Sequence, residues 1–205
     1  GLIAQASAGP DGYSGDVFTV KWDGDLKLGE KVKLPKGINI YDFVVLPGES
    51  KENLVLAYDD AGFLNLYDAK GLRVWRSATG NGGFLTTFKR QETGAIYSGS
   101  GSWSVKDRLV QRNREVLAVN RVPLVEMAKG IGYKKSQIKD YWWNGFSMEE
   151  SLLVDDIRGS IQDYALAGDK VMVLTSPFMG VKFDKILKGE NPLGVVLYIY
   201  SITGR

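Results

Sequence analysis

The sequence predicts an all-β protein built from repeated antiparallel meanders. Three observations lead to this fold class: a degenerate internal repeat, a succession of short apolar runs separated by turn residues, and a scarcity of segments with helical character. Residues 122–129 are the one stretch with such character. We expect a loop or a single turn there, because so short a helix is marginal.

The internal repeat aligns residues 17–46 with residues 138–167 without gaps. The identical positions are Trp22 with Trp143, Gly24 with Gly145, Ile40 with Ile161 and Asp42 with Asp163. In each copy a Trp-Asp/Asn-Gly turn is followed at a fixed distance by an Asp-aromatic pair. Self-similarity of this length is typical of repeat architectures, and it favours a repeat protein over an enzyme.

The elements of the first third follow one another as strands joined by tight turns. Alternation or short apolar runs indicate strands over residues 17–22, 41–46, 54–58, 63–67 and 72–75. The turns between them are Asp23-Gly24, Pro47-Gly48, residues 59–62 and Lys70-Gly71, which suit positive or preset backbone angles. These elements predict one antiparallel meander without a helix.

The rest of the chain repeats this pattern with insertions, which predicts three units. Residues 171–174 match 54–57, and a weaker match places 114–120 over 52–58. We expect blade units over 13–80, 81–132 and 133–205, each with about four strands, and an insertion at 176–194. Residues 1–12 are expected to be an N-terminal extension or a closing strand.

Composition excludes several classes of function. The 205-residue chain contains no cysteine and no histidine, which excludes disulfides, thiolate nucleophiles, the usual zinc sites and histidine-based catalysis. With 26 basic and 24 acidic residues, the net charge of +2 gives little reason to expect nucleic acid as a partner. No apolar stretch approaches the roughly 20 residues that span a bilayer, so we expect no membrane span.

The first unit resembles the FG-GAP or VCBS repeat. The resemblance rests on residues 42–75: an Asp-led apolar strand, a Pro-Gly turn, a second apolar strand, an acidic turn, a third strand, and a Lys-Gly turn before a strand that ends in Trp75. Residues 161–174 look like a shortened second copy. The resemblance implies an integrin-like β-propeller with four-stranded blades around a channel. It also implies an exported bacterial protein of the periplasm, cell surface or extracellular space.

The sequence departs from the calcium-binding members of this family. Their loops supply closely spaced carboxylates, because calcium takes about six to eight oxygen ligands. The corresponding loops here, residues 47–53 and 168–170, hold few carboxylates, and each carries a lysine. We therefore expect no cofactor, and calcium is disfavoured.

The repeated aspartates and tryptophans are the first candidate functional residues. We expect Asp42 and Asp163 to be structural acceptors of hydrogen bonds rather than acid-base groups. Trp22 and Trp143 precede equivalent turns, so packing between neighbouring blades is favoured over stacking on carbohydrate. Trp142 has no counterpart, and strand alternation puts its ring on the face opposite to Trp143. Trp142 is therefore the candidate binding residue, with a glycan as one ligand that its ring would suit.

Three further features are expected to be structural. Residues 99–103 lack the frames of a phosphate loop or a serine nucleophile. The adjacent carboxylates at 59–60, 149–150 and 155–156 indicate solvated turn charges, because a glycosidase needs two carboxyls facing across a cleft. Basic residues within 108–135 are interleaved with acids, so a solvated face is favoured over a site for a polyanion.

Together these features predict a non-catalytic binding or assembly module. Three units are too few to close a propeller of about four to eight blades, and open sheet edges invite pairing. We expect part of a larger propeller, completed by a protein partner or by self-association. The resemblance of Gly1-Leu2 to Gly71-Leu72, which opens the last strand of the first unit, supports this expectation. A filament or coat subunit and a propeller-type hydrolase are the alternatives left open.

Overall fold

All regular elements that the structure describes are β-strands. The structure is a computed structural model that describes residues 2–7, 13–48, 52–80, 82–83, 86–89, 102–123, 133–176 and 194–202. No helix occurs in these ranges, which confirms the all-β prediction. Accordingly, this part of the chain offers no helix that is long and apolar enough to cross a membrane.

The strands form four antiparallel sheets, each made of consecutive strands. The first sheet contains β1 (Leu2–Ser7), β2 (Tyr13–Trp22) and β3 (Leu26–Lys31), and the second contains β4 (Phe43–Pro47), β5 (Asn53–Tyr58), β6 (Leu64–Tyr67) and β7 (Arg73–Arg76). The third contains β10 (Val110–Arg112), β11 (Glu115–Pro123), β12 (Tyr133–Trp143) and β13 (Met148–Ile157). The fourth contains β14 (Ser160–Ala167), β15 (Lys170–Ser176) and β16 (Val196–Ser201). A separate pair joins β8 (Thr86–Lys89) to β9 (Ser102–Val105).

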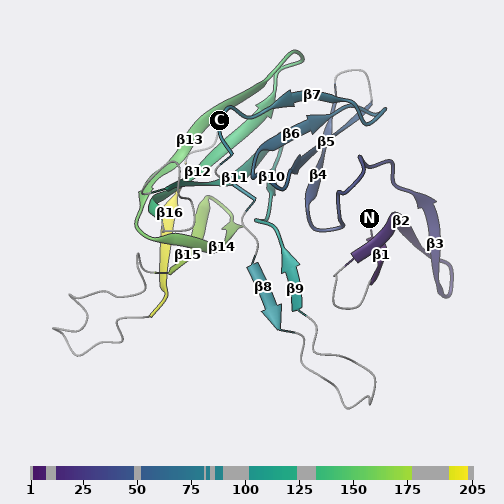
Figure 1. Cartoon of the computed structure of the whole chain (residues 1–205), viewed down its shortest axis with the longest axis horizontal. Coiled ribbons are helices and arrows are strands. Elements are labelled where there is room, and N and C mark those ends of the chain that lie inside the picture. Colours follow the sequence, from purple (N-terminus) through teal and green to yellow (C-terminus); the bar gives the residue numbers. More distant parts are fainter. Residues whose placement is uncertain are drawn as a thin grey trace.

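The third sheet forms the centre of the fold, because both of its faces are buried. Successive side chains of β11 point to opposite faces. Val116 and Ala118 belong to a core cluster shared with the second sheet, and Leu117 and Val119 belong to a cluster shared with the fourth. The second, third and fourth sheets therefore stack face to face, and in Figure 1 the four sheets follow one another in sequence order from the first at the right to the fourth at the left.

The internal repeat corresponds to a long hairpin followed by the next sheet. Trp22 ends β2 and Trp143 ends β12, and each is followed by a turn to the partner strand. Gly24 and Gly145 lie in these turns with φ of 72° and 102°, angles that glycine adopts without steric cost. The repeat therefore marks equivalent hairpins in the first and third sheets.

The sheets do not coincide with the three expected units. The expected unit 13–80 combines two strands of the first sheet with the whole second sheet, and 133–205 combines two strands of the third sheet with the fourth. Residues 2–7 form β1, which pairs with β2. Instead of three four-stranded blades, the described residues form four sheets of three or four strands, and no closed barrel or propeller is detected among them.

One local prediction is wrong and two lie outside the described residues. Val122 and Pro123 belong to β11 and face Lys135 and Tyr133 across the ladder, although a loop or turn was expected from residue 122. The long partner strand β12 supplies the ladder that extends β11 to this point. Residues 124–129 and the body of the expected insertion, 177–193, lie outside the described residues.

Tight turns of the second sheet are built by aspartates that accept backbone hydrogen bonds. The Asp59 Oδ1 atom accepts from the backbone N–H groups of Ala61 and Phe63 at 3.0 and 2.9 Å. In the next turn, the Asp68 Oδ1 atom accepts from Lys70 and Leu72 at 2.9 and 2.8 Å. Each aspartate satisfies two amides that the ladder leaves unpaired, as expected for a turn residue.

Candidate functional site

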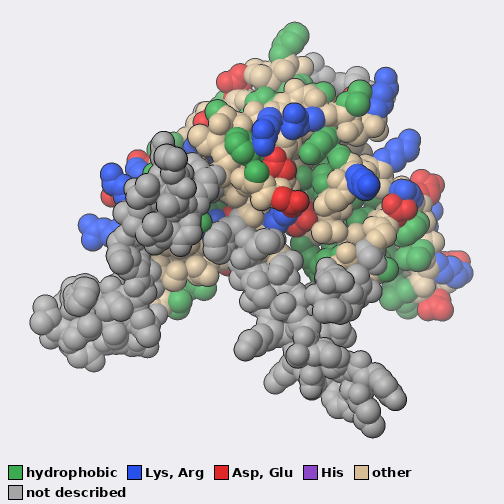
Figure 2. Space-filling model, in the orientation of Figure 1, with side chains coloured by type: hydrophobic (Ala, Val, Ile, Leu, Met, Phe, Trp, Pro, Cys, Tyr) green, Lys and Arg blue, Asp and Glu red, His purple; other side chains and the backbone are tan. Residues whose placement is uncertain are grey.

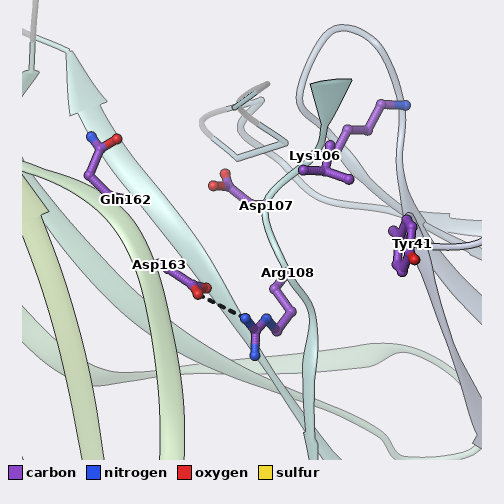
Figure 3. A pocket seen from close by; sticks show the side chains of 7 residues that line it. Tyr41, Lys106, Asp107, Arg108, Gln162 and Asp163 are labelled. Atoms are coloured by element: carbon purple, nitrogen blue, oxygen red, sulfur yellow. Dashed lines mark hydrogen bonds and ion pairs between the residues drawn. The ribbon is translucent and has the colours of Figure 1, made fainter. Parts of the chain in front are cut away.

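A pocket of about 300 Å³ lies where three parts of the chain meet. Tyr41 comes from the segment before β4, residues 105–108 connect β9 to β10, and Gln162 and Asp163 come from β14. Figure 3 shows Arg108 and Asp163 facing each other in this pocket, with Lys106 and Tyr41 on the side of the second sheet. The pocket is thus formed where three segments that are distant in the sequence come together.

A buried ion pair holds the wall of this pocket in place. Arg121 on β11 is only 1% exposed, and its Nη1 and Nη2 atoms donate to Asp107 Oδ2 and Oδ1 at 2.5 and 2.8 Å. The guanidinium also donates to the Ser160 hydroxyl and to the Ile161 carbonyl at the start of β14. Because a buried charge requires partners for all its donors, Arg121 ties the 105–108 segment to the third and fourth sheets.

Lys106 ties the same segment to the second sheet. Its Nζ atom lies 3.0 Å from Asp60 Oδ1 and 3.8 Å from Asp42 Oδ2, and it donates to the Tyr58 carbonyl at 3.3 Å. Burial raises the pKa of Asp42, and the positive charge of Lys106 works against that rise. Asp42 also accepts a hydrogen bond from the Asn39 backbone N–H at 3.4 Å, so it braces the turn before β4.

Asp163, the repeat partner of Asp42, has a different environment. It is half-exposed, lines the pocket and accepts a hydrogen bond from Arg108 Nη2 at 2.8 Å. Its Oδ1 atom also accepts from the backbone N–H of Tyr164 at 2.9 Å. The two repeated aspartates therefore both accept backbone hydrogen bonds and both pair with a cation from residues 106–108, although only Asp163 faces the pocket.

Two buried tyrosines join neighbouring sheets below the pocket. The Tyr58 hydroxyl donates to the Val119 carbonyl at 3.2 Å, and the Tyr164 hydroxyl lies 2.6 Å from the Leu117 carbonyl and 2.8 Å from the Arg108 carbonyl. Burial raises the pKa of both phenols, so they remain neutral hydrogen-bond donors at physiological pH. Their contacts are structural links between strands.

The charges of the pocket are mutually satisfied. Asp107 pairs with Arg121, and Asp163 pairs with Arg108. Hydrolysis of a glycoside needs one carboxyl that holds a proton and a second that faces it across the bond to be broken. In this pocket each of the two carboxylates instead forms an ion pair with an arginine.

The tryptophans singled out by the repeat lie in unlike environments. Trp143 is half-buried and packs against the core cluster between the second and third sheets. Trp22 is 72% exposed, so it does not pack between sheets within this chain. Trp142 is half-buried on β12, where its register partners are Glu115 and Glu149. None of the three lines the pocket between the sheets.

Other sequence candidates fall on paired charges or outside the described residues. Several basic residues of the segment 108–135 form ion pairs, including Arg112 with Glu115 at 2.6 Å and Lys135 with Asp155 at 2.6 Å. Residues 99–101 are outside the described ranges. Within those ranges, no group of three or more acidic side chains is placed to hold a metal ion.

A second kind of candidate site is the exposed apolar face at each end of the stack. On the first sheet, the register places Leu2, Phe18, Val20, Trp22, Leu26 and Leu28 on one face, which we name the first-sheet apolar face. On the fourth sheet, Met172, Leu174, Leu197 and Ile199 share one face, with Val195 just before β16, and we name this set the fourth-sheet apolar face. Figure 2 shows hydrophobic side chains among charged ones at the margin of the molecule, over the first sheet.

Sequence reasoning singled out Asp163 but missed the buried pair of Arg121 and Asp107 beside it. Arg121 carried a signal, because it is a lone charge within the apolar run 116–123. A charged residue at a buried strand position requires a partner, but its partner Asp107 cannot be found from strand periodicity. Comparison of the chain with models of protein families, with curated proteins and with solved structures yields no match.

Proposed function

We propose that this protein is a non-catalytic binding or assembly module whose stacked sheets associate with a further protein surface. The observation that carries the proposal is the exposure of an apolar face at both ends of the stack. Leu26 and Leu28 on the first sheet are 62% and 67% exposed, and Leu197 and Ile199 on the fourth are each 58% exposed. Contiguous apolar side chains of this kind mark interaction sites in water-soluble proteins.

The interior of the protein indicates how such a face is normally covered. The third sheet buries one face against the second sheet and the other against the fourth. Burial of apolar area is the main favourable contribution to sheet packing. The outer faces of the first and fourth sheets have a similar alternating apolar pattern, and no other sheet among the described residues covers them, which supports a partner that supplies a further sheet.

The resemblance to FG-GAP or VCBS repeats supports a propeller-type assembly. In such an assembly, successive blades of consecutive strands pack face to face, and incomplete arrays require completion. We therefore propose a protein partner or a second copy as the binding partner, in an exported or cell-surface setting. A glycan at Trp142 is a further candidate ligand, which a glycan array with Trp142→Ala as the control would test.

Size-exclusion chromatography with light scattering tests this proposal directly. We expect a mass above that of the 22.6 kDa chain, increasing with protein concentration over about 1 to 200 μM, the range in which interfaces of modest area associate. A monodisperse single chain across the whole range, with no change on addition of any candidate partner, would contradict the proposed function.

The two opposite apolar faces favour one second candidate, a subunit of an extracellular filament or coat. A chain with associating faces at both ends forms rings if the rotation between copies closes and open fibres if it does not. Negative-stain electron microscopy of the concentrated protein distinguishes the two. Periodic fibres support the filament, and discrete particles of uniform size support the closed assembly.

A further inference from the structure

We propose that copies of this chain associate head to tail, with the first-sheet apolar face of one copy packed on the fourth-sheet apolar face of the next. This inference rests on the proposed function and names the surfaces that carry it. Both surfaces are parts of the same chain, and the second and third sheets lie between them in Figure 1. A contact between two different faces leaves one face of each kind free at the ends of the assembly.

The first sheet has one apolar and one polar face. Its register pairs Val20 with both Leu2 and Leu28, and Trp22 with Leu26, so the apolar side chains of three strands share one face. The opposite face carries Gln5, Thr19, Lys21 and Lys27 in addition to Ile3 and the buried Val17. The Asp16–Lys31 ion pair lies at the end of the apolar face away from Trp22. The apolar side chains nearest the hairpin turn therefore form one surface around Trp22.

In the fourth sheet, β15 and β16 carry apolar side chains on both faces, whereas β14 places Asp163 beside Leu174 at one edge of the outer face. Val171 and Val173 point into the core cluster shared with the third sheet. Met172 and Leu174 alternate with them and therefore point the other way, where Leu174 lies beside Leu197 and Met172 beside Ile199. An antiparallel sheet at the edge of a fold commonly exposes a polar face to water. The apolar side chains on the outer face of β15 and β16 depart from this pattern, which favours a partner surface that covers them.

The two faces are alike in kind, because both are apolar faces of antiparallel sheets. The first-sheet apolar face is formed by β1, β2 and β3, whereas the fourth-sheet apolar face is formed by β15 and β16, and paired strands lie about 4.8 Å apart. Sheets of this type pack about 10 Å apart with interdigitating side chains, which is how the third sheet contacts both neighbours. The head-to-tail contact continues the same stacking across a molecular boundary.

The exposed area suits a reversible contact between copies. Eight side chains of the two faces are more than one-third exposed: Leu2, Trp22, Leu26, Leu28, Leu174, Val195, Leu197 and Ile199. At roughly 60 to 120 Å² of apolar area for each side chain of this size, they supply on the order of 500 to 1,000 Å². Stable interfaces bury about 1,200 to 2,000 Å² in total. We therefore expect association that depends on concentration rather than a permanent oligomer.

Complementary variants test the pairing of the two faces. The front variant carries Leu26→Lys and Leu28→Lys, the back variant carries Leu197→Lys and Ile199→Lys, and the matched control carries Leu152→Lys at an exposed position of β13. Sedimentation velocity measures the mass of each variant alone and of an equimolar mixture of the front and back variants.

The four lysines of the front and back variants replace exposed side chains, and far-UV circular dichroism with a thermal melt confirms that each variant folds. If a lysine variant unfolds, the serine versions of the same substitutions take its place.

We expect the front variant and the back variant each to remain a single chain when alone. The dissociation constant for self-association should be at least tenfold higher than that of the unmodified chain. The equimolar mixture should form a species of twice the 22.6 kDa mass and no larger one, because each variant retains one intact face. The Leu152→Lys control should associate as the unmodified chain does.

Three results would overturn the inference. If the back variant associates normally while the front variant does not, the contact joins two first sheets. If both variants associate as well as the unmodified chain, the contact lies elsewhere, and the proposed function stands without this inference. If the unmodified chain never associates and binds no partner, the proposed function itself fails.

Discussion

At the residue scale, one buried charge organises the meeting point of three sheets. Arg121 is almost fully buried in the mainly apolar strand β11. Its guanidinium donates to Asp107 in the segment before β10 and to Ser160 and Ile161 at the start of β14. The energy of the ion pair is opposed by the cost of removing two charges from water. The main contribution of the Arg121–Asp107 pair is geometric, because a bidentate contact restricts the position of the 105–108 segment.

Replacing one member of the Arg121–Asp107 pair should lower the stability of the fold strongly, and replacing both should lower it much less. We expect Arg121→Met to lower the free energy of unfolding by about 3 to 5 kcal/mol, because the buried Asp107 loses its bidentate ion-pair partner. The double variant Arg121→Met/Asp107→Leu should recover most of that loss. Urea unfolding provides the measurement. Lys27→Met, which breaks the exposed pair with Asp23, is the control and should change stability by less than about 0.5 kcal/mol. Equal losses in the single and double variants would contradict the argument.

A surface carboxylate should give the stability a defined pH dependence. Hydrogen bonds from Lys135, Gln137 and the Asp156 backbone lower the pKa of Asp155 from 3.8 to about 2. Between these values the unfolded chain binds more protons, so the contribution is complete above pH 4 and is lost as the pH falls toward 2. Asp155→Asn should therefore destabilise the protein at pH 7 and match the unmodified protein near pH 2. Denaturant melts at both pH values check this, and a difference that persists at pH 2 would refute it.

At the element scale, alternation and turn residues account for most strands of the second sheet. The predicted strands 54–58 and 63–67 correspond to β5 and β6, which are rich in buried apolar residues and bounded by aspartate turns. The strand β3 has no such signal, since nearly all its side chains are exposed. It is a strand because β2 supplies a hydrogen-bonding partner, and its own sequence does not reveal that pairing.

Two turn glycines with the same backbone angle should respond differently to alanine. Gly62 and Gly71 have φ of 80° and 81°, but a Cβ at Gly62 would lie 2.2 Å from the Gly82 carbonyl oxygen, whereas nothing lies within 4 Å of one at Gly71. We expect Gly71→Ala to cost about 1 to 2 kcal/mol from the left-handed angle alone. Gly62→Ala should cost about 1 to 3 kcal/mol more, because a backbone oxygen must move. Thermal melts compare the two, and equal shifts in melting temperature would contradict the steric explanation.

At the scale of the whole molecule, the fold is a series of stacked sheets with a covered centre and exposed ends. The two core clusters share the third sheet, so the second and fourth sheets are each packed on one of its faces. The first sheet contributes no side chain to either cluster. It contacts the segment before β4 through Gln5, which hydrogen-bonds Asn39 and Ile40. A series of this kind is open to extension at both ends.

If apolar faces drive association of the whole molecule, salt should strengthen it. Sulfate is excluded from protein surfaces and favours burial of apolar area, whereas contacts between exposed charges weaken as salt screens them. We expect sodium sulfate at about 0.5 M to shift the mass distribution toward larger species in light scattering. The variant Leu197→Lys/Ile199→Lys should not respond. Dissociation of the unmodified protein in sulfate would indicate a contact carried by charges instead.

Local sequence signals are sufficient to predict the class of fold and the places where the chain turns. Side-chain alternation and turn chemistry are local properties, so β5, β6 and the aspartate turns between them can be recognised within a few residues. The matching Trp-x-Gly positions likewise indicated two equivalent hairpins. Because these signals depend only on near neighbours, they did not reveal how many sheets the strands form.

Which residues meet, and which faces remain exposed, follows from the packing of the sheets and not from local signals. Arg121 finds Asp107 and the start of β14 from segments 14 and 40 residues away, and no local pattern contains that pairing. The same holds for Trp22 and Trp143, which occupy equivalent positions in the sequence although one is exposed and the other packs on the core. The physical reason is that burial depends on what lies across the sheet. The third sheet has neighbours on both sides, and the first sheet has an apolar face at the end of the stack.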